Sequence, residues 1–553
     1  MAADRLIQDR LGPPGNSSQQ SQGETPRIFP PFGVWGIALF AIITIFIFRS
    51  TNLTADHAID NILTLALGFF ALMTVILWFT LYSGHSLFVR LIPLSVLFVS
   101  ISVFVIFYRI DHVSGELVPV FARRFSANPD QLLPQLQRQL KKDETRRIDL
   151  ATSSDHDFPQ FLGPERQAVV PGPRLSPAWA TTAPRQLWKK PIGAGWSAFS
   201  AVNGYAVTME QRGPLELVVC YDLKTGVVQW SHATTARYQN KLGGIGPRST
   251  PTIHQGKVYS LGVTGQLLCL DGADGKLLWK RDLRKEFGIS PEEDEQAIYY
   301  GRSNSPLIVD NTVIIPAGGP PAGNQSSLVA YDKDTGEEIW RGGSSQISYS
   351  SPSLVTLCGV RQILIVNLDN IAGHDPTTGK ELWQHEWVGD NFANASASQA
   401  LAVDGDRVFV SKGYGVGAML LQISNSPDSE WSAEKIWSKH NALRTKFTNI
   451  VIKDDCAYGL SDGILQCVDI DTGKIYWKRG RYGHGQILLV GDLILVLSEK
   501  GNLHLVEAVS EKHHELAKFP AIEGKTWNNI CLYGPYLLVR NSEQAACYEL
   551  PTE

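Results

Sequence analysis

Cysteine is scarce in this chain, and its spacing forms neither a disulfide framework nor a metal site. The 553 residues include seven cysteines, none adjacent to another and none in a Cys-x-x-Cys pair. Such spacings are what zinc sites and thiol redox motifs require. None of the 13 histidines shows a spacing such as His-x-x-x-His. We therefore expect no metal held by a cysteine or histidine motif.

An excess of basic charge is also lacking. Lys and Arg number 50 against 54 Asp and Glu, giving a net charge of −4, and no long block of one sign occurs. Nucleic-acid binding is disfavoured, because it needs a basic footprint. No glycine-rich phosphate loop or nucleophile elbow appears, and "GYGVG" (413–417) is expected between strands, with no helix after it. The sequence therefore offers no catalytic motif.

Three segments lack any charged residue: 32–48, 62–82 and 91–108. Each is about as long as the 17 to 25 residues needed to cross the hydrocarbon of a membrane. Aromatic residues near their ends suit the membrane interface: Trp35, Trp78, Tyr82 and Tyr108. Soluble cores rarely hold three such runs in succession. A cleavable signal peptide is also disfavoured, because about thirty polar residues precede the first span and two more spans follow it. We predict three transmembrane helices within residues 32–110.

The loop charges leave the membrane orientation open. Four arginines lie on one side of the spans and four on the other: Arg5, Arg10, Arg27 and Arg90 against Arg49, Arg109, Arg123 and Arg124. An odd number of spans does place the N-terminus and the bulk of the chain on opposite sides. We expect residues 1–31 to be a disordered tail and 111–155 a linker. Within that linker, residues 128–142 have the cap, proline and terminal lysines of a short helix.

A repeated motif dominates the rest of the chain. Asp, Gly and Trp keep one spacing in five stretches: "CYDLKTGVVQW" (220–230), "CLDGADGKLLW" (269–279), "AYDKDTGEEIW" (330–340), "GHDPTTGKELW" (373–383) and "CVDIDTGKIYW" (467–477). A degenerate copy ends at Trp437, and partial copies occupy 505–519 and 546–550. The half missing from the last copy appears as "QLWKKPIG" (186–193). Four short strands per unit predict an eight-bladed, all-β propeller over residues 187–553, closed by the N- and C-terminal strands together.

Comparing equivalent positions among the copies shows whether the motif could bind a metal or only forms a turn. Asp471 aligns with Lys224, Ala273, Asp334 and Thr377 in its four sister copies, so the aspartate is not a constant feature of the turn and a calcium-loop interpretation fails. Asp at the turn start bonds nearby backbone, and Gly supplies the positive φ that closes the hairpin. Four cysteines share one strand position in different blades and are expected to be buried: Cys220, Cys269, Cys467 and Cys547. One tryptophan per unit is expected to wedge neighbouring blades together: Trp188, Trp230, Trp279, Trp340, Trp383, Trp437 and Trp477.

These motifs resemble the pyrroloquinoline quinone (PQQ) repeat of eight-bladed quinoprotein-type propellers, and the resemblance covers residues 187–553. The preceding "FPQFLGPERQ" (158–167), within a lead-in segment at 156–186, is similar to the lead-in of such propellers in planctomycete-type bacteria. The resemblance implies a multi-pass inner-membrane protein whose propeller lies in the periplasm and whose N-terminus lies inside.

Two branches of that superfamily imply different functions. BamB is a non-enzymatic propeller that presents loops to partner proteins, whereas the PQQ-dependent dehydrogenases hold quinone and calcium and oxidise alcohols or sugars. No cysteine precedes Cys220, so the lipid attachment of BamB is missing, and the three spans would take over anchoring. Eight blades in about 370 residues leave little room for the insertions that build a quinone pocket. We expect a non-catalytic, BamB-like scaffold for envelope proteins without a cofactor; the alternative is a membrane-bound dehydrogenase with PQQ and calcium.

The entries to the innermost strands would surround the mouth of the central channel. Basic and aromatic residues at these entries form a candidate ligand site: Trp196, Arg248, Arg302, Tyr349, Lys446, His484, Lys525 and Trp527. Such a funnel suits an anionic or planar ligand. The alternative is that these groups only satisfy backbone and channel water. A second candidate, "SPEEDEQ" (290–296), has four acidic residues in a row that could capture calcium, but they lack calcium-loop spacing, so a solvated surface loop is favoured. The length of this loop would suit contact with a partner.

Overall fold

A computed structural model describes residues 29–50, 57–134, 136, 148–388, 395–428 and 430–553. Nearly all of the expected disordered tail at 1–31 lies outside these residues. The chain forms two compact units, which are described separately. Among the described residues, the first contains 29–50 and Ile62–Phe107, and the second contains 57–61 and Tyr108–Glu553.

The first unit confirms the three predicted apolar helices. They are α1 (Phe32–Ser50), α2 (His57–Tyr82) and α3 (Leu87–Phe107). All three are long and apolar enough to cross a membrane. Large apolar side chains on them are exposed, as on Phe40 and Phe98. A helix that exposes this much apolar surface needs lipid or protein around it.

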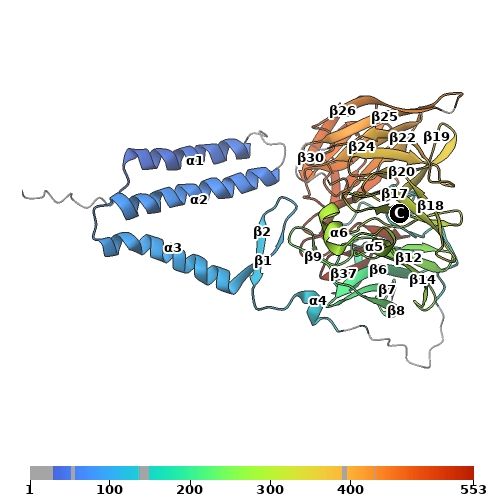
Figure 1. The fold of residues 1–553 in the computed structure, drawn as a ribbon, viewed down its shortest axis with the longest axis horizontal. Coiled ribbons are helices and arrows are strands. Elements are labelled where there is room, and N and C mark those ends of the chain that lie inside the picture. The colour runs from blue at the N-terminus through green and yellow to red at the C-terminus, as the bar shows by residue number, and fades with distance from the viewer. Residues whose placement is uncertain (1–28, 51–56, 135, 137–147, 389–394, 429) are drawn as a thin grey trace, which may run out of the picture. The chain divides into compact units, whose positions relative to one another are not determined.

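The second unit contains the predicted eight-bladed propeller. Each blade is a four-stranded antiparallel sheet, and the blades follow the chain around the ring (Figure 1). The first four are β5–β8 (Ser200–Val202, Tyr205–Arg212, Leu215–Asp222, Val228–Thr235), β11–β14 (Thr252–His254, Lys257–Leu261, Gln266–Asp271, Leu277–Asp282), β15–β18 (Leu307–Val309, Thr312–Gly318, Ser326–Asp332, Glu338–Gly342) and β19–β22 (Ser353–Leu357, Val360–Val366, Asn370–His374, Glu381–Glu386).

The next three blades continue the ring. They are β23–β26 (Leu401–Val403, Arg407–Lys412, Gly417–Asn425, Trp431–Lys439), β27–β30 (Ile450–Lys453, Cys456–Ser461, Ile464–Asp469, Ile475–Arg481) and β31–β34 (Gln486–Val490, Leu493–Leu497, Asn502–Glu507, Glu515–Pro520). First strands of neighbouring blades contact one another, for example β5 with β11 and β35, so they surround the centre of the ring. A small ribbon of β9 (Gln239–Asn240) and β10 (Gly244–Ile245) follows the first blade.

The eighth blade joins the two ends of the propeller, as the split repeat predicts. Strands β35 (Cys531–Tyr533), β36 (Tyr536–Arg540) and β37 (Gln544–Glu549) come from the end of the chain. Their outer partner is β4 (Arg185–Pro191), which pairs antiparallel with β37 and sets Trp188 opposite Cys547. Closure of this kind removes the free edges that an open ring of sheets would leave.

The repeated tryptophans connect successive blades. Trp230 donates its indole N–H to the carbonyl of Gly272 in the next blade, at 2.8 Å. Five further tryptophans donate the same bond to a carbonyl of the next blade, at 2.8 to 3.2 Å: Trp188 to Leu223, Trp279 to Lys333, Trp340 to Pro376, Trp437 to Ile470 and Trp477 to Val509. Trp383 differs, because the blade after it has the degenerate turn; its indole bonds Gln362 of its own blade at 2.7 Å.

The turn residues act as the repeat suggested. Asp222 accepts hydrogen bonds from the backbone and the hydroxyl of Thr225, and Asp332, Asp375 and Asp469 repeat the arrangement. The turn glycine has a second role. Gly275 has a φ of +72°, and a Cβ there would lie 2.5 Å from the ring of Trp230. The four equivalent cysteines are buried and free.

The lead-in segment lies against the inner strands of the ring. Phe158 pairs with Ala201 of β5, and Pro159 accepts a hydrogen bond from Ile253 of β11. The buried guanidinium of Arg166 donates to the carbonyls of Ser305 and Pro306 at 3.0 and 2.9 Å. Strand β3 (Val169–Val170) then runs parallel to β31. The segment therefore contributes apolar side chains and a buried cation to the centre of the propeller.

The linker contains a hairpin that the sequence analysis did not predict. Strand β1 (Tyr108–Val113) pairs with β2 (Pro119–Arg123), beginning directly after α3 (Figure 1). The expected helix at 128–142 is shorter in the described residues: α4 is only Pro129–Leu132. It ends because Leu133 precedes Pro134, and a residue before proline favours extended backbone. Residues 135 and 137–142 of this stretch lie outside the described residues.

Candidate binding site at the channel mouth

Four aromatic rings from four blades form a row at the entries to the innermost strands. Trp196 precedes β5, Trp527 precedes β35, and their ring centroids are 4.9 Å apart. Phe447, before β27, lies 4.7 Å from Trp527 and 5.5 Å from His484, before β31. Three of the four residues are among those the sequence nominated. The fold therefore brings together side chains separated by more than 300 positions in the sequence.

Lys525 covers this aromatic row. Its ammonium nitrogen lies 4.0 Å from the ring centroid of Trp527 and 5.0 Å from that of Trp196, within the range of cation–π attraction. Burial lowers the pKa of Lys525 to about 8, against the opposing charges of Glu499 and Asp111. The same nitrogen donates a hydrogen bond to the carbonyl of Val113 at 3.2 Å.

Glu499 joins three segments at this point. It lies in the turn between β32 and β33, where Oε1 accepts the indole N–H of Trp527 at 3.0 Å and Oε2 accepts the backbone N–H of His484 at 3.2 Å. Oε1 also accepts the backbone N–H of Gly115 at 2.7 Å. Burial raises the pKa of the carboxyl, but the hydrogen bonds from Gly115 and Trp527 and the charge of His484 outweigh burial, and the pKa lies below its ordinary value.

The tip of the β1–β2 hairpin therefore occupies the mouth. Gly115 is buried there, and Lys446 donates to its carbonyl oxygen at 3.3 Å. A Cβ on Gly115 would lie 2.2 Å from the ring of His484, so only glycine fits. Two of the nominated cations, Lys446 and Lys525, thus contact the protein's own backbone. The hairpin is the feature of this site that sequence reasoning missed.

Arg248 and Tyr349 belong to an adjoining cluster of tyrosines. The Arg248 guanidinium lies 5.1 Å from the ring centroid of Tyr238 and donates to the carbonyls of Gly246 and Gly243 at 2.7 and 3.0 Å. Tyr349 packs edge-on against Tyr300 at 5.4 Å. Burial lowers the pKa of Arg248 to about 10 and raises that of Tyr349. Trp196 donates to the Gly243 carbonyl and so connects this cluster to the aromatic row.

Arg302 does not face the mouth. It is 1% exposed, and its guanidinium pairs with Asp294 at 2.8 Å and donates to the Ala317 carbonyl at 2.8 Å. The expected loop at 290–296 is also wrong. It forms the helix α6 (Pro291–Ala297), with Ser290 and Glu293 as a capping box. Buried Asp294 joins Arg302 to Arg284, so this acidic segment stabilises the fold, together with the short helix α5 (Leu283–Glu286) before it.

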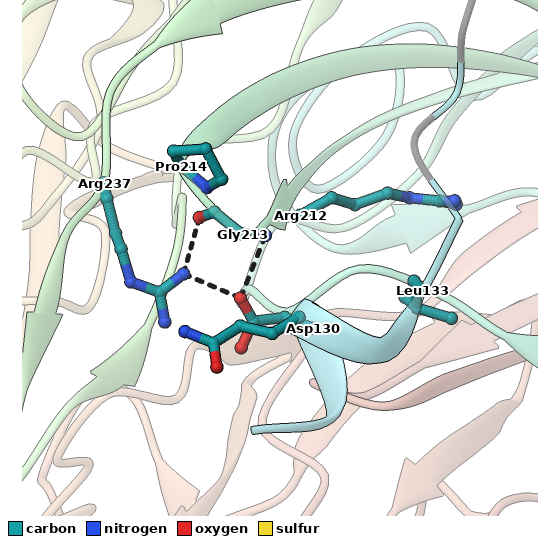
Figure 2. Close-up of a pocket in the computed structure, with 7 residues that line it drawn as sticks. Asp130, Leu133, Arg212, Gly213, Pro214 and Arg237 are labelled. Carbon is teal, nitrogen blue, oxygen red and sulfur yellow. Dashed lines mark hydrogen bonds and ion pairs between the residues drawn. The ribbon is translucent and has the colours of Figure 1, made fainter. Parts of the chain in front are cut away.

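A cleft of about 390 Å³ lies where α4 contacts the first blade. Figure 2 shows the Asp130 carboxylate pointing toward Arg237 and the backbone N–H of Gly213, at 2.7 and 3.1 Å. Arg237 also donates to the Gly213 carbonyl, and Arg212 donates to that of Pro134. The polar groups lining this cleft are therefore used to attach the linker to the propeller.

The donors at the mouth do not fit the calcium ion of a quinoprotein. Calcium takes six to eight oxygen ligands, usually several of them carboxylates. Within the described ranges, no three His, Cys, Asp or Glu side chains converge on a point that could hold a metal. The carboxylate at the mouth, Glu499, already accepts three N–H groups.

The residues that the sequence analysis missed had partial signals. Phe447 lies in the same entry stretch as Lys446, and Glu499 lies in a turn that returns to the same end of a blade. The hairpin was indicated by the glycine between two alternating segments in "HVSGELV". Nothing in the sequence indicated that this hairpin reaches the mouth.

Comparison with known proteins finds similarity to BamB and to quinoprotein dehydrogenases over parts of the chain. Residues 214–479 match the family model described as outer membrane protein assembly factor BamB. The propeller is a BamB-like PQQ-repeat propeller. The BamB of Shewanella oneidensis is 20% identical over 331 residues, which are 57% of this chain and 76% of that protein. The quinohemoprotein alcohol dehydrogenase ADH-IIG of Pseudomonas putida is 26% identical over 136 residues, 24% of this chain but only 18% of that protein.

Solved structures include both kinds of relative. BamB from Moraxella catarrhalis is 14% identical, with 66% of this chain and 98% of that chain covered and a TM-score of 0.46. The quinohemoprotein alcohol dehydrogenase from Comamonas testosteroni is also 14% identical, with 74% and 83% covered and a TM-score of 0.49.

Proposed function

We propose that this BamB-like propeller is a non-catalytic binding module for envelope proteins, held at the inner membrane by α1–α3 with the propeller in the periplasm. The observation that carries the proposal is the occupied mouth: the tip of the protein's own hairpin is hydrogen-bonded to Glu499, Lys446 and Lys525 at the strand entries, where a ligand site is expected from the sequence. A catalytic pocket requires that space, whereas a scaffold does not. The unsuitable donors for calcium support the same conclusion.

The outer rim of the propeller suits protein partners. The residue before the blade-docking tryptophan is apolar and more than two-fifths exposed in four blades: Leu278, Ile339, Ile436 and Tyr476. These side chains lie on the outermost strands β14, β18, β26 and β30. Exposed apolar side chains at regular positions offer contact area, and outer strands offer edges to which a partner strand can add.

Photo-crosslinking tests this proposal in intact cells. A photoreactive amino acid replaces Ile339 or Leu278 in the full-length protein, and the matched control carries it at exposed Lys280 of the same outer strand as Leu278. We expect a discrete adduct with one protein partner from the two apolar positions and a weaker one or none from Lys280. Equal, diffuse labelling from all three positions would count against a partner on the rim.

A second candidate function, a PQQ-dependent dehydrogenase oxidising an alcohol or sugar, is supported by one specific feature. The row of Trp196 and Trp527 beneath the Lys525 ammonium would suit a planar anionic ring. For such a ring to bind, the hairpin tip would have to leave the mouth. The Glu499 carboxylate at the mouth already accepts three N–H groups, so it does not fit the calcium ion that such a dehydrogenase requires.

A further inference from the structure

The hairpin tip contacts the mouth mainly through its main chain. The N–H of Gly115 donates to Glu499, and the carbonyls of Val113 and Gly115 accept from Lys525 and Lys446. Hydrogen bonds to charged partners are about twice as strong as neutral ones. Main-chain recognition does not depend on particular side chains, so any segment with the same backbone shape offers these groups.

The shape of the tip is nevertheless restricted. Ser114 accepts the N–H groups of Glu116 and Val118 through its hydroxyl, which fixes the turn. The ring of His484, held against Phe447, fills the space where a side chain on residue 115 would lie. The mouth therefore selects a turn with glycine at its apex.

The next residue adds a charge preference. The carboxylate of Glu116 lies 3.3 Å from the guanidinium of Arg481, and both side chains are partly exposed. An exposed pair contributes little affinity but disfavours a basic residue at this position. The mouth thus suits a glycine followed by an acidic residue.

The hairpin is held in place by its own connections. Strands β1 and β2 pair along the stem, and α4 attaches the following segment to the first blade through Asp130. An occupant linked to its site in this way has an effective concentration in the millimolar range. A free peptide that binds the same groups must compete with it.

We propose that the channel mouth is a peptide-recognition site, occupied in cis by the Ser114–Gly115–Glu116 turn and able to accept a turn of the same kind, glycine followed by an acidic residue, from a protein partner. This rests on the proposed binding role. A partner turn would displace the hairpin, so binding at the mouth would release the segment that directly follows α3.

A disulfide tests the cis contact. The Cβ position of residue 115 lies 3.0 Å from the Cβ of His484, slightly below the usual separation of about 3.5 to 4.5 Å in disulfides. Gly115→Cys/His484→Cys is made in the full-length protein, with a protease recognition sequence inserted after Lys142. After oxidation and cleavage, the membrane part and the propeller should stay joined on a non-reducing gel. The control pair Val120→Cys/His484→Cys, on the exposed stem, should separate; separation of both pairs would overturn the contact.

Peptide binding tests the site itself, without any partner. A fluorescent peptide of residues 112–119 is titrated into full-length Gly115→Val in detergent, and anisotropy is measured. The valine should expel the tip, so the peptide should bind at least about ten-fold more tightly than it binds the wild type. A peptide with valine in place of glycine should not bind, and Val120→Ala protein should behave as wild type.

Two results would overturn this proposal. The first is equal, weak binding of the peptide to Gly115→Val and to wild type, when both show the same thermal unfolding profile. If Gly115→Val unfolds, the reduced and oxidised forms of Gly115→Cys/His484→Cys replace it: the reduced form, whose tip can leave the mouth, should bind the peptide at least as well as wild type does, and the oxidised form, whose tip is locked in the mouth, should not bind it. Binding to the oxidised form would place the peptide elsewhere. A missing rim partner would refute the proposed function and leave these results unaffected.

Discussion

The backbone nitrogen of Gly115 lies 2.7 Å from Oε1 of Glu499, although 384 residues separate them in the chain. The same oxygen accepts the indole N–H of Trp527, so one carboxylate connects the hairpin to the seventh and eighth blades. The hairpin begins at Tyr108, directly after α3. The mouth of the propeller is thereby linked to the segment that directly follows the three apolar helices.

Replacing Glu499 with glutamine should loosen the hairpin without removing volume. The neutral amide weakens the charge-assisted bonds that Glu499 accepts from three N–H groups and places its own N–H donors against at least one of them, a loss of about 1 to 3 kcal/mol. Hydrogen exchange at residues 113–118 should become faster, measured by mass spectrometry on the full-length protein. Glu511→Gln, an exposed control, should leave exchange unchanged. Unaltered protection in Glu499→Gln would mean that the carboxylate does not hold the tip.

Substituting two glycines with similar backbone angles distinguishes two effects of an added side chain: a steric clash with a neighbour and strain in the backbone. Gly275 and Gly204 have φ of +72° and +80°, but only Gly275 faces a tryptophan, the ring of Trp230; nothing lies within 4 Å of a Cβ on Gly204. Gly204→Ala should lose about 1 kcal/mol of stability, and Gly275→Ala about 1 to 3 kcal/mol more, because the blade contact must open. Denaturant unfolding measures both. Equal losses would show that the tryptophan does not require the glycine.

Arg302 should be important for stability and unimportant for binding at the mouth. Removing it leaves Asp294 buried with only Arg284 as a charged partner, and breaking a buried pair costs about 3 to 5 kcal/mol. We expect Arg302→Ala to lower the thermal unfolding midpoint clearly. A matched Arg361→Ala, which breaks the exposed pair with Asp310, should change it little. Similar midpoints for the two variants would contradict the structural role.

Glu216 should make stability depend on pH. Burial raises the pKa of this carboxyl to about 7, although it accepts the N–H of Val263. Between about pH 4.5 and 7 the folded protein binds more protons at this site than the unfolded chain, so its contribution to stability decreases as pH rises. Glu216→Gln should remove that decrease, gaining on the order of 3 kcal/mol over wild type above pH 7. Parallel stability–pH curves would contradict the raised pKa.

The repeat made most of the fold predictable. The Asp, Gly and Trp spacing reports turns and blade contacts that each unit makes locally or with its neighbour, so the eight blades, their closure through Trp188 and the three apolar helices could be predicted from pattern alone. The degenerate turn after Trp383 also had a structural consequence, since that tryptophan bonds within its own blade. Local sequence patterns were therefore sufficient to predict the architecture.

The candidate site was predictable only in part. Aligning the repeats with one another locates the start of each innermost strand. This alignment therefore predicts that five residues meet at one mouth: Trp196, Lys446, His484, Lys525 and Trp527. The alignment gives no information on segments inserted between the repeats. One such segment contains the helix at 291–297, and its Asp294 forms a buried ion pair with Arg302, which therefore does not face the mouth. The alignment also does not show that the turn at Gly115 fills the mouth, because that contact joins segments with no shared repeat.

Binding of PQQ and calcium is the measurement that tests the binding-module account most directly. Full-length protein in detergent is titrated with PQQ at fixed calcium, and the tryptophan fluorescence is followed, since Trp196 and Trp527 both line the mouth. The account predicts no saturable, calcium-dependent quenching in the wild type, because the hairpin tip occupies the mouth and the carboxylate there is already bonded. Saturable quenching that disappears when calcium is chelated would contradict it and favour the dehydrogenase.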